Sequence, residues 1–295
     1  MGASGSRRLG AYVLAADPTW LRSSISRYYD AVDVLVVSAA ADATGWTGKP
    51  IRSAECVEAA RALDARRIVT VEHGTWRDVQ EPIRADTRQR RQALAAVGAD
   101  VDWVLQIDTD ELLPDLAALH RVLDEADRLD IDVVEWPMRV LYRRLPDGRY
   151  LQVTTRTGTP FYEYPGPIAV RPGVELIESR RATGRFLRPV VVGDTSSLQV
   201  ARPAEEREVR LPLLHDPESI VHNSWGRSRA VVHAKLASSA HNQGLRSLRY
   251  YWATWLPTPL RWRRMRDFHP FAAGLWPRLA PTTAALDDLL VAGDR

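Results

Sequence analysis

A cluster of carboxylates follows a short apolar run at residues 103–107. Asp108, Asp110 and Glu111 lie within four positions, and the run before them is short and uncapped, which favours a strand in the core of a sheet over a helix. Side chains two apart on an extended chain point the same way, so we expect Asp108 and Asp110 to meet one divalent cation, or a cation and a sugar hydroxyl. The alternative is a solvated acidic turn ahead of a helix that begins near Pro114.

The elements that must position this cluster are alternating strands and helices. We expect strands at residues 12–16, 33–38, 67–72 and 103–107, and helices at 20–28, 54–63 and 84–97. Alternation of this kind, repeating roughly every 25 to 35 residues, is typical of βαβ units with right-handed crossovers. The pattern predicts an α/β protein with a mostly parallel, Rossmann-like sheet, whose ligands bind at the carboxyl ends of the strands.

The pattern changes in the second half of the chain. Residues 133–145 and 149–154 are strand-like, and the turn residues Pro146, Asp147 and Gly148 between them predict a hairpin. Shorter strand-like pieces occur at 168–171 and 189–192, and a helix is expected from about Arg227 to Asn242. We therefore expect a C-terminal α+β region on the acceptor side of the sheet.

Composition places the chain among ordinary globular proteins. Of its 295 residues, 45% are hydrophobic and 26% are charged, and no apolar run is long enough to cross a membrane. A single cysteine, Cys56, excludes a disulfide framework and a cysteine-based zinc site, and indicates a reducing compartment. We expect a cytoplasmic protein.

The order of residues from Trp103 to Leu113 is a more specific signal than Asp-x-Asp alone. An aromatic residue, an apolar run, Asp-Thr-Asp-Glu and two leucines follow one another. Together with the first strand, the loop at 38–45 and the Arg-rich helix, this pattern resembles the family 2 glycosyltransferases of the GT-A fold over roughly residues 10–240. Those enzymes often carry Asn-Glu after strand one and Asn-x-Ser-x-Asp-Gly after strand two, where this chain has Asp17 and Asp42.

The resemblance implies a domain organisation and an activity. It implies a GT-A domain at 1–240, with a nucleotide-binding half at 10–115 and an acceptor half at 116–240, followed by a helical Trp- and Arg-rich appendage at 241–295. It also implies a hexosyltransferase-like enzyme that takes a sugar from a UDP- or GDP-sugar donor. The acceptor would be a carbohydrate, a lipid or a small molecule.

The resemblance further implies a metal site on the donor diphosphate. Mn²⁺ or Mg²⁺ would be held by Asp108, Asp110 and His222, and an imidazole ligand favours Mn²⁺. The other interpretation of His222 is a core histidine or a neighbour of a helix cap. Asp110 and Glu111 are the catalytic candidates.

Donor binding and acceptor activation need further side chains. The residues expected to bind the donor are Asp17, Asp42, Arg84, Arg88, Asp108 and Lys235. Arginines at the start of a helix are also typical of a solvated face. An inverting transferase needs a carboxylate base, for which Glu163, Glu178 and Asp194 are open alternatives.

Two other functions share parts of this pattern. A nucleotidyltransferase would use the same sheet and acidic site, but residues 15–20 contain no glycine for a phosphate loop. A nucleic-acid or polyanion binding module would use the arginines and aromatic residues of 246–268, and leaves the carboxylates without a purpose. That segment also suits a membrane surface or sugar stacking, or helices that pack their aromatic side inward. We expect no nucleic-acid partner and consider peripheral membrane contact.

Overall fold

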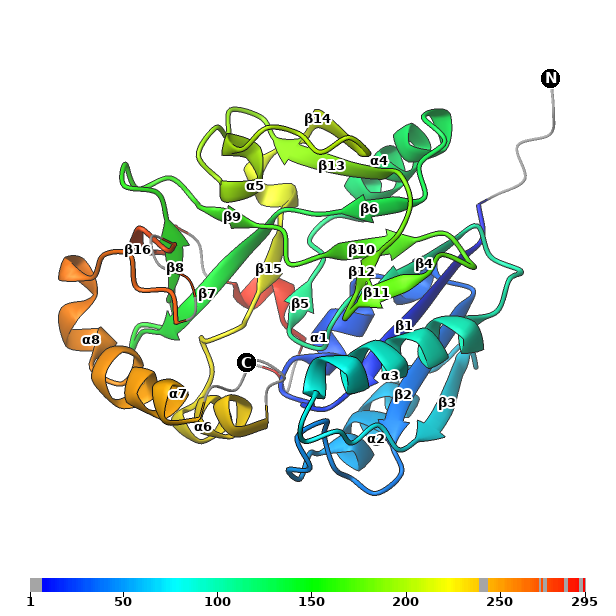
Figure 1. Cartoon of the computed structure of the whole chain (residues 1–295), viewed down its shortest axis with the longest axis horizontal. Coiled ribbons are helices and arrows are strands. Elements are labelled where there is room, and N and C mark those ends of the chain that lie inside the picture. The colour runs from blue at the N-terminus through cyan, green and yellow to red at the C-terminus, as the bar shows by residue number, and fades with distance from the viewer. Residues whose placement is uncertain are drawn as a thin grey trace.

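The computed structural model describes residues 7–238, 244–270, 272, 275–283, 286–291 and 294. Its centre is an eight-stranded sheet in which most neighbouring strands are parallel and β10 runs antiparallel to both of its neighbours (Figure 1). The strand order is β14 (Glu208–Leu214), β13 (Phe186–Val191), β6 (Val133–Glu135), β10 (Pro167–Val170), β4 (Trp103–Gln106), β1 (Leu9–Ala15), β2 (Val34–Ala40) and β3 (Val69–Gly74).

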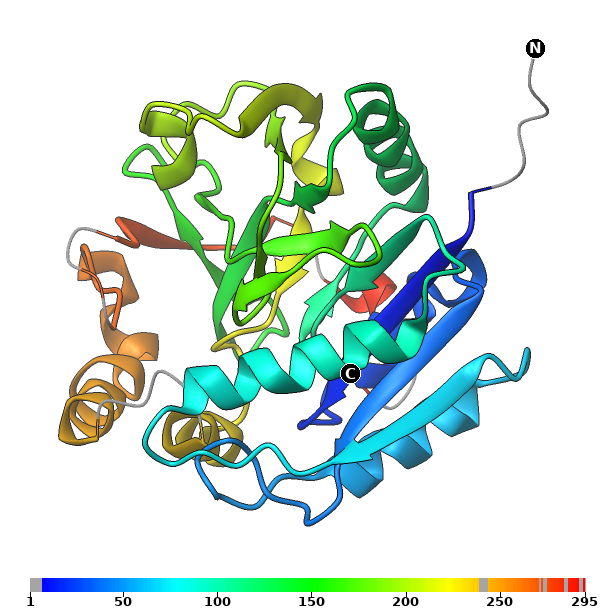
Figure 2. The same cartoon turned by 45° about the vertical axis from the view of Figure 1, so that its right-hand side comes forward.

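Helices cover both faces of the half of this sheet that contains β4, β1, β2 and β3. Figure 2 shows α3 lying across one of these faces. Alternate residues of β1 face two apolar layers: Val13 packs with α1, α2 and α4, whereas Leu14 packs with α3. Burial on both faces explains why β1 is apolar throughout. The helices of this half are α1 (Leu21–Ser26), α2 (Ser53–Leu63), α3 (Pro82–Val97) and α4 (Leu116–Arg128).

A second, smaller sheet lies beside the first. Its order is β16 (Arg278–Pro281), β8 (Tyr150–Thr154), β7 (Met138–Arg144), β15 (Ile220–His222) and β5 (Glu111–Leu112), with β9 (Tyr162–Glu163) also paired to β7. A short ribbon joins β11 (Leu176–Glu178) to β12 (Arg181–Ala182). The remaining helices are α5 (Leu198–Ala201), α6 (Arg229–Ser238), α7 (Leu245–Tyr250) and α8 (Thr258–Arg261), and a π-helical turn at Tyr251–Trp255 follows α7.

The α/β class, the first four strands, the helices between them and the β7–β8 hairpin are confirmed, with shifts of a few residues at their ends. Two expectations are wrong. Residues 133–145 form two strands in different sheets, because Pro137 between them cannot donate to a ladder. Asp108 and Asp110 lie in a turn between β4 and β5, not on an extended strand. Helix α6 begins at Arg229, and its expected end at Asn242 lies outside the described residues.

Gly10 permits α3 to lie close to β1. A Cβ at this position would clash with Cγ1 of Val97. We expect Gly10→Ala to lower the free energy of unfolding by roughly 1–3 kcal/mol, as overpacking a dense core does. Urea denaturation measures this. The double variant Gly10→Ala/Val97→Ala should lose less than the sum of the two single losses, and strictly additive losses would contradict the proposed clash.

Candidate functional site

The order of the large sheet reverses at its central strands β1 and β4, which run parallel, and we call the region at their carboxyl ends the crevice. From β1 the chain continues to β2 and β3 on one side, whereas β4 pairs with β1 on the other side. Such a reversal of strand order is where open α/β sheets bind ligands. Asp17 comes soon after β1 and Asp108 comes soon after β4, so both carboxylates belong to this crevice.

Asp108 is held by a buried arginine from α3. The Arg90 NH2 group donates to both carboxylate oxygens at 3.0 and 3.2 Å, and Arg90 Nε donates to Asp86 at 2.7 Å. Burial would raise the pKa of Asp108, but the charges of Arg90 and Arg180 hold it below its ordinary value. Asp108 is therefore ionised at neutral pH, and its side chain keeps 29% of its surface exposed, enough to meet a ligand.

Asp110 meets groups from the far end of the chain because β15 pairs with β5. The register places His222 opposite Glu111, and the Asn223 N–H donates to the Asp110 carbonyl at 2.8 Å. The Asp110 carboxylate then faces His222 Nε2 at 3.6 Å and Lys235 Nζ at 3.2 Å. Despite burial, Lys235 and other nearby positive groups hold the pKa of Asp110 well below its ordinary value.

Arg227 joins the two acidic segments of the crevice. Its guanidinium donates to Asp17 and to Asp110, while its Nε donates to the Asn223 carbonyl at 2.9 Å. Arg52 also contacts Asp17, at 2.5 Å. Burial opposes ionisation of Asp17, but Arg227 and the Thr19 hydrogen bonds lower its pKa. Neither Arg227 nor Arg52 is among the residues expected from the sequence, and no local pattern marks either one, since their partners lie far away in the sequence.

Glu111 does not have the catalytic place expected for it. Its side chain is fully buried and accepts two hydrogen bonds from Arg180, at 2.5 and 2.9 Å. It also accepts from the Asp108 backbone N–H at 3.1 Å. Glu111 therefore lies beneath the site and braces the acidic turn, where it cannot touch a substrate.

Three expected donor-binding residues lie apart from the cluster. Arg84 pairs with Glu81, Arg88 lies 3.6 Å from Asp78, and the exposed Asp42 accepts hydrogen bonds from Thr44. The structure does not bring these three residues into contact with the acidic cluster, and their role in donor binding stays a prediction. The inward face of α3 instead carries Arg90, which the helical spacing to Leu94 and Val97 indicates, whereas positions 84 and 88 lie on its exposed side.

The three carboxylates considered as a base differ in their surroundings. Glu178 is exposed and pairs with Arg181 at 3.0 Å, and Asp194 accepts backbone hydrogen bonds within its own loop. Glu163 lies in β9, two strands away from His222, and accepts a hydrogen bond from the Trp276 indole. Burial raises the pKa of Glu163, partly opposed by Trp276 and His222. Of the three, Glu163 is the best placed to accept a proton.

Asp108, Asp110 and His222 offer the ligand types that Mn²⁺ and Mg²⁺ accept in proteins. His222 Nδ1 is buried and has no hydrogen-bond partner within the described part of the chain. No three His, Cys, Asp or Glu side chains of the described ranges already stand together as a metal site. Arg227 and Lys235 both contact Oδ2 of Asp110 instead, so a cation at Asp110 would bind beside these contacts or in place of one of them.

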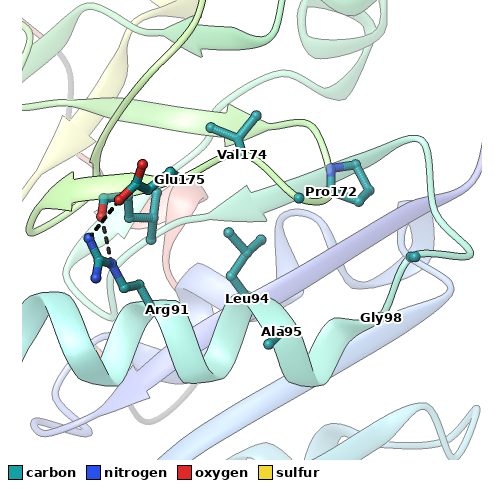
Figure 3. A pocket seen from close by; sticks show the side chains of 10 residues that line it. Arg91, Leu94, Ala95, Gly98, Pro172, Val174 and Glu175 are labelled. Carbon is teal, nitrogen blue, oxygen red and sulfur yellow. Dashed lines mark hydrogen bonds and ion pairs between the residues drawn. The ribbon is translucent and has the colours of Figure 1, made fainter.

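A cavity of about 380 Å³ lies elsewhere, between the second half of α3 and the segment before β11 (Figure 3). Arg91 closes one side by donating to the Leu176 carbonyl at 2.7 Å and lying 3.4 Å from Glu175. Leu94, Val174 and Pro172 supply apolar walls. None of the predicted site residues lines this cavity, so it is separate from the acidic cluster.

Comparisons with known proteins provide little guidance. No family model and no curated protein matches the chain. A 4-diphosphocytidyl-2C-methyl-D-erythritol synthase structure is 17% identical, with coverage of 57% of this chain and 76% of its own, at a TM-score of 0.33. The same enzyme from Anaerococcus prevotii is 10% identical, with coverage of 57% of this chain and 73% of its own, at a TM-score of 0.33. A mannose-6-phosphate isomerase from Helicobacter pylori is 14% identical, with coverage of 56% of this chain and 71% of its own, at a TM-score of 0.34. Scores this low support no functional argument.

Proposed function

We propose that the protein is a glycosyltransferase of the GT-A type that moves a sugar from a UDP- or GDP-sugar to an acceptor, with Mn²⁺ or Mg²⁺ as cofactor. One observation carries the proposal. Asp108 and Asp110, at the end of the central strand β4, share the crevice with Asp17, and the second sheet brings His222, Arg227 and Lys235 to the same place. This is where an open α/β sheet binds a nucleotide.

The charges of this network support the need for a cation. Within the described structure, six carboxylates pair with five basic groups of Arg and Lys: Asp17, Glu55, Asp86, Asp108, Asp110 and Glu111 with Arg52, Arg90, Arg180, Arg227 and Lys235. The basic groups are thus already compensated, and a leaving nucleoside diphosphate brings uncompensated negative charge. A divalent cation held by Asp108, Asp110 and His222 would supply that compensation.

The chain's own residues have distinct roles in this proposal. Lys235 keeps about a third of its side chain exposed, at 34%, and can contact a phosphate oxygen without leaving the crevice. Arg227 holds Asp17 and Asp110 in register across the crevice. Glu163 is the residue that would accept the proton of the acceptor hydroxyl, because burial raises its pKa and so makes this carboxylate a stronger base.

We expect UDP or GDP to bind about tenfold or more tightly in Mn²⁺ than in EDTA, because the diphosphate otherwise meets a network without spare positive charge. Isothermal titration calorimetry measures both affinities. Asp110→Asn should remove the dependence on Mn²⁺, whereas Asp147→Asn, a change at an exposed carboxylate in the β7–β8 turn and outside the network, should preserve it. Equal affinities in Mn²⁺ and EDTA for the unchanged protein would refute the metal site.

The reaction products distinguish this proposal from nucleotidyl transfer. A glycosyltransferase releases a nucleoside diphosphate from a nucleotide sugar, whereas a nucleotidyltransferase joins a nucleoside triphosphate to a sugar phosphate and releases pyrophosphate. Chromatography of reactions supplied with each substrate pair identifies the product. Release of pyrophosphate alone would replace the proposed activity with the other one.

A further inference from the structure

The segment that follows α6 presents apolar side chains to solvent. Leu245 is 84% exposed, Leu248 is 42% exposed and Trp252 is 59% exposed. They are spaced by three and four residues along α7 and the π-helical turn, so they lie on one side of the helix. In α8, Leu260 is 91% exposed. Such exposure of large apolar side chains within one short segment indicates a contact surface.

The opposite side of the same segment is fixed to the protein. Trp255 is fully buried, stacks on Tyr251 with ring centroids 5.3 Å apart, and donates to the carbonyls of Tyr142 and Trp225. The Arg143 guanidinium covers the Trp255 ring at 3.8 Å. The outward side chains are thus carried on an anchored helix, and Figures 1 and 2 both place α7 and α8 at an outer edge of the molecule, far from β3.

Positive charge surrounds these apolar side chains. Residues 244–266 contain no aspartate, glutamate or lysine. All of their arginines are exposed, namely Arg246, Arg249, Arg261, Arg263, Arg264 and Arg266. We call the exposed residues Leu245, Leu248, Trp252 and Leu260, together with these six arginines, the α7–α8 surface.

We propose that the α7–α8 surface docks on an anionic lipid membrane. Exposed leucines and a tryptophan beside arginines are the composition with which a helix lies in the headgroup region, where apolar side chains enter the acyl boundary and arginines meet lipid phosphates. A nucleic acid offers the same phosphates, but it has no apolar layer for Leu245 and Leu260. No described helix is long and apolar enough to cross a bilayer, and the contact is peripheral.

This docking is independent of the proposed sugar transfer. Cosedimentation of the whole protein with vesicles tests it, using phosphatidylcholine alone or phosphatidylcholine with about one-third phosphatidylserine. We expect at least about tenfold stronger partitioning to the anionic vesicles, and weaker partitioning as salt rises. Equal partitioning to both vesicle types, or none to either, would overturn the proposal.

Matched variants separate a membrane from a polyanion partner. Leu245→Ser/Leu248→Ser/Trp252→Ser should reduce partitioning about tenfold or more and leave the protein folded, because all three side chains lie outside the buried core. The control Ile177→Ser/Leu198→Ser changes residues that are 48% exposed elsewhere, and should partition like the unchanged protein. The proposal fails if both variants still partition normally, or if single-stranded DNA binds tightly and displaces the protein from vesicles.

Discussion

Replacing Asp110 with alanine is expected to reduce sugar transfer by about 100-fold or more, the scale seen when a preorganised charge is removed from a transition state. Asp110 lies beyond the end of β4 and contacts Arg227, Lys235 and His222 rather than the apolar core. Its loss leaves Arg227 paired with Asp17, so the variant should stay folded. Release of UDP or GDP from a nucleotide sugar, followed over time, measures the activity.

Two further variants make this result interpretable. Asp110→Asn keeps the shape and removes the charge, so it should be nearly as inactive as the alanine variant. Asp147→Asn changes an exposed carboxylate in the β7–β8 turn that pairs with Arg149, and should retain full activity. A folded Asp110→Ala protein that releases nucleotide at the normal rate would remove Asp110 from the site.

Replacing Arg180 with methionine is expected to lower the free energy of unfolding by about 3–5 kcal/mol, the cost of leaving one partner of a buried ion pair alone. Glu111 is fully buried and Arg180 keeps only 5% of its side chain exposed, so water cannot compensate the remaining carboxylate. Urea denaturation followed by circular dichroism measures the loss.

The neighbouring residue provides the control for this prediction. Arg181 pairs with Glu178 while 65% of its side chain is exposed, so Arg181→Met should change stability by at most about 1 kcal/mol. The double variant Arg180→Met/Glu111→Gln should recover part of the loss, because a neutral amide replaces the buried carboxylate. Similar free energies of unfolding for the Arg180 and Arg181 variants would show that the buried pair contributes no more to stability than the exposed pair.

Local patterns were sufficient for the first half of the fold. Apolar runs predicted β1 to β4, and the acidic turn after β4 was expected to be the site because strand ends bind ligands. Of the arginines of α3, Arg90 contacts Asp108, whereas Arg84 and Arg88 lie on the exposed side of the helix. The helical spacing from Arg90 to Leu94 and Val97 is the sequence signal that Arg90 faces inward.

The remaining parts of the site depend on pairings between distant segments. His222 lies beside Asp110 only because β15 pairs with β5, and Arg180 reaches Glu111 from the short β11–β12 ribbon. No spacing within one segment specifies such a pairing, since it forms only when segments far apart in the sequence come together. The family resemblance supplied His222 as an expected ligand, and the contacts of Arg227 and Arg180 became visible only in three dimensions.

The antiparallel pairing of β10 with β4 affects how the chain folds while it is being synthesised. Pro167 comes 61 positions after Gln106 in the chain, and the Pro167 carbonyl accepts a hydrogen bond from the Gln106 side-chain amide at 3.0 Å. Until that later segment is synthesised, the outer edge of β4 has no strand to pair with, and the amide of a side chain that ends fully buried lacks its acceptor. Nascent chains whose synthesis pauses between Gln106 and Pro167 expose an unpaired strand edge on β4. A pause there therefore favours aggregation over folding.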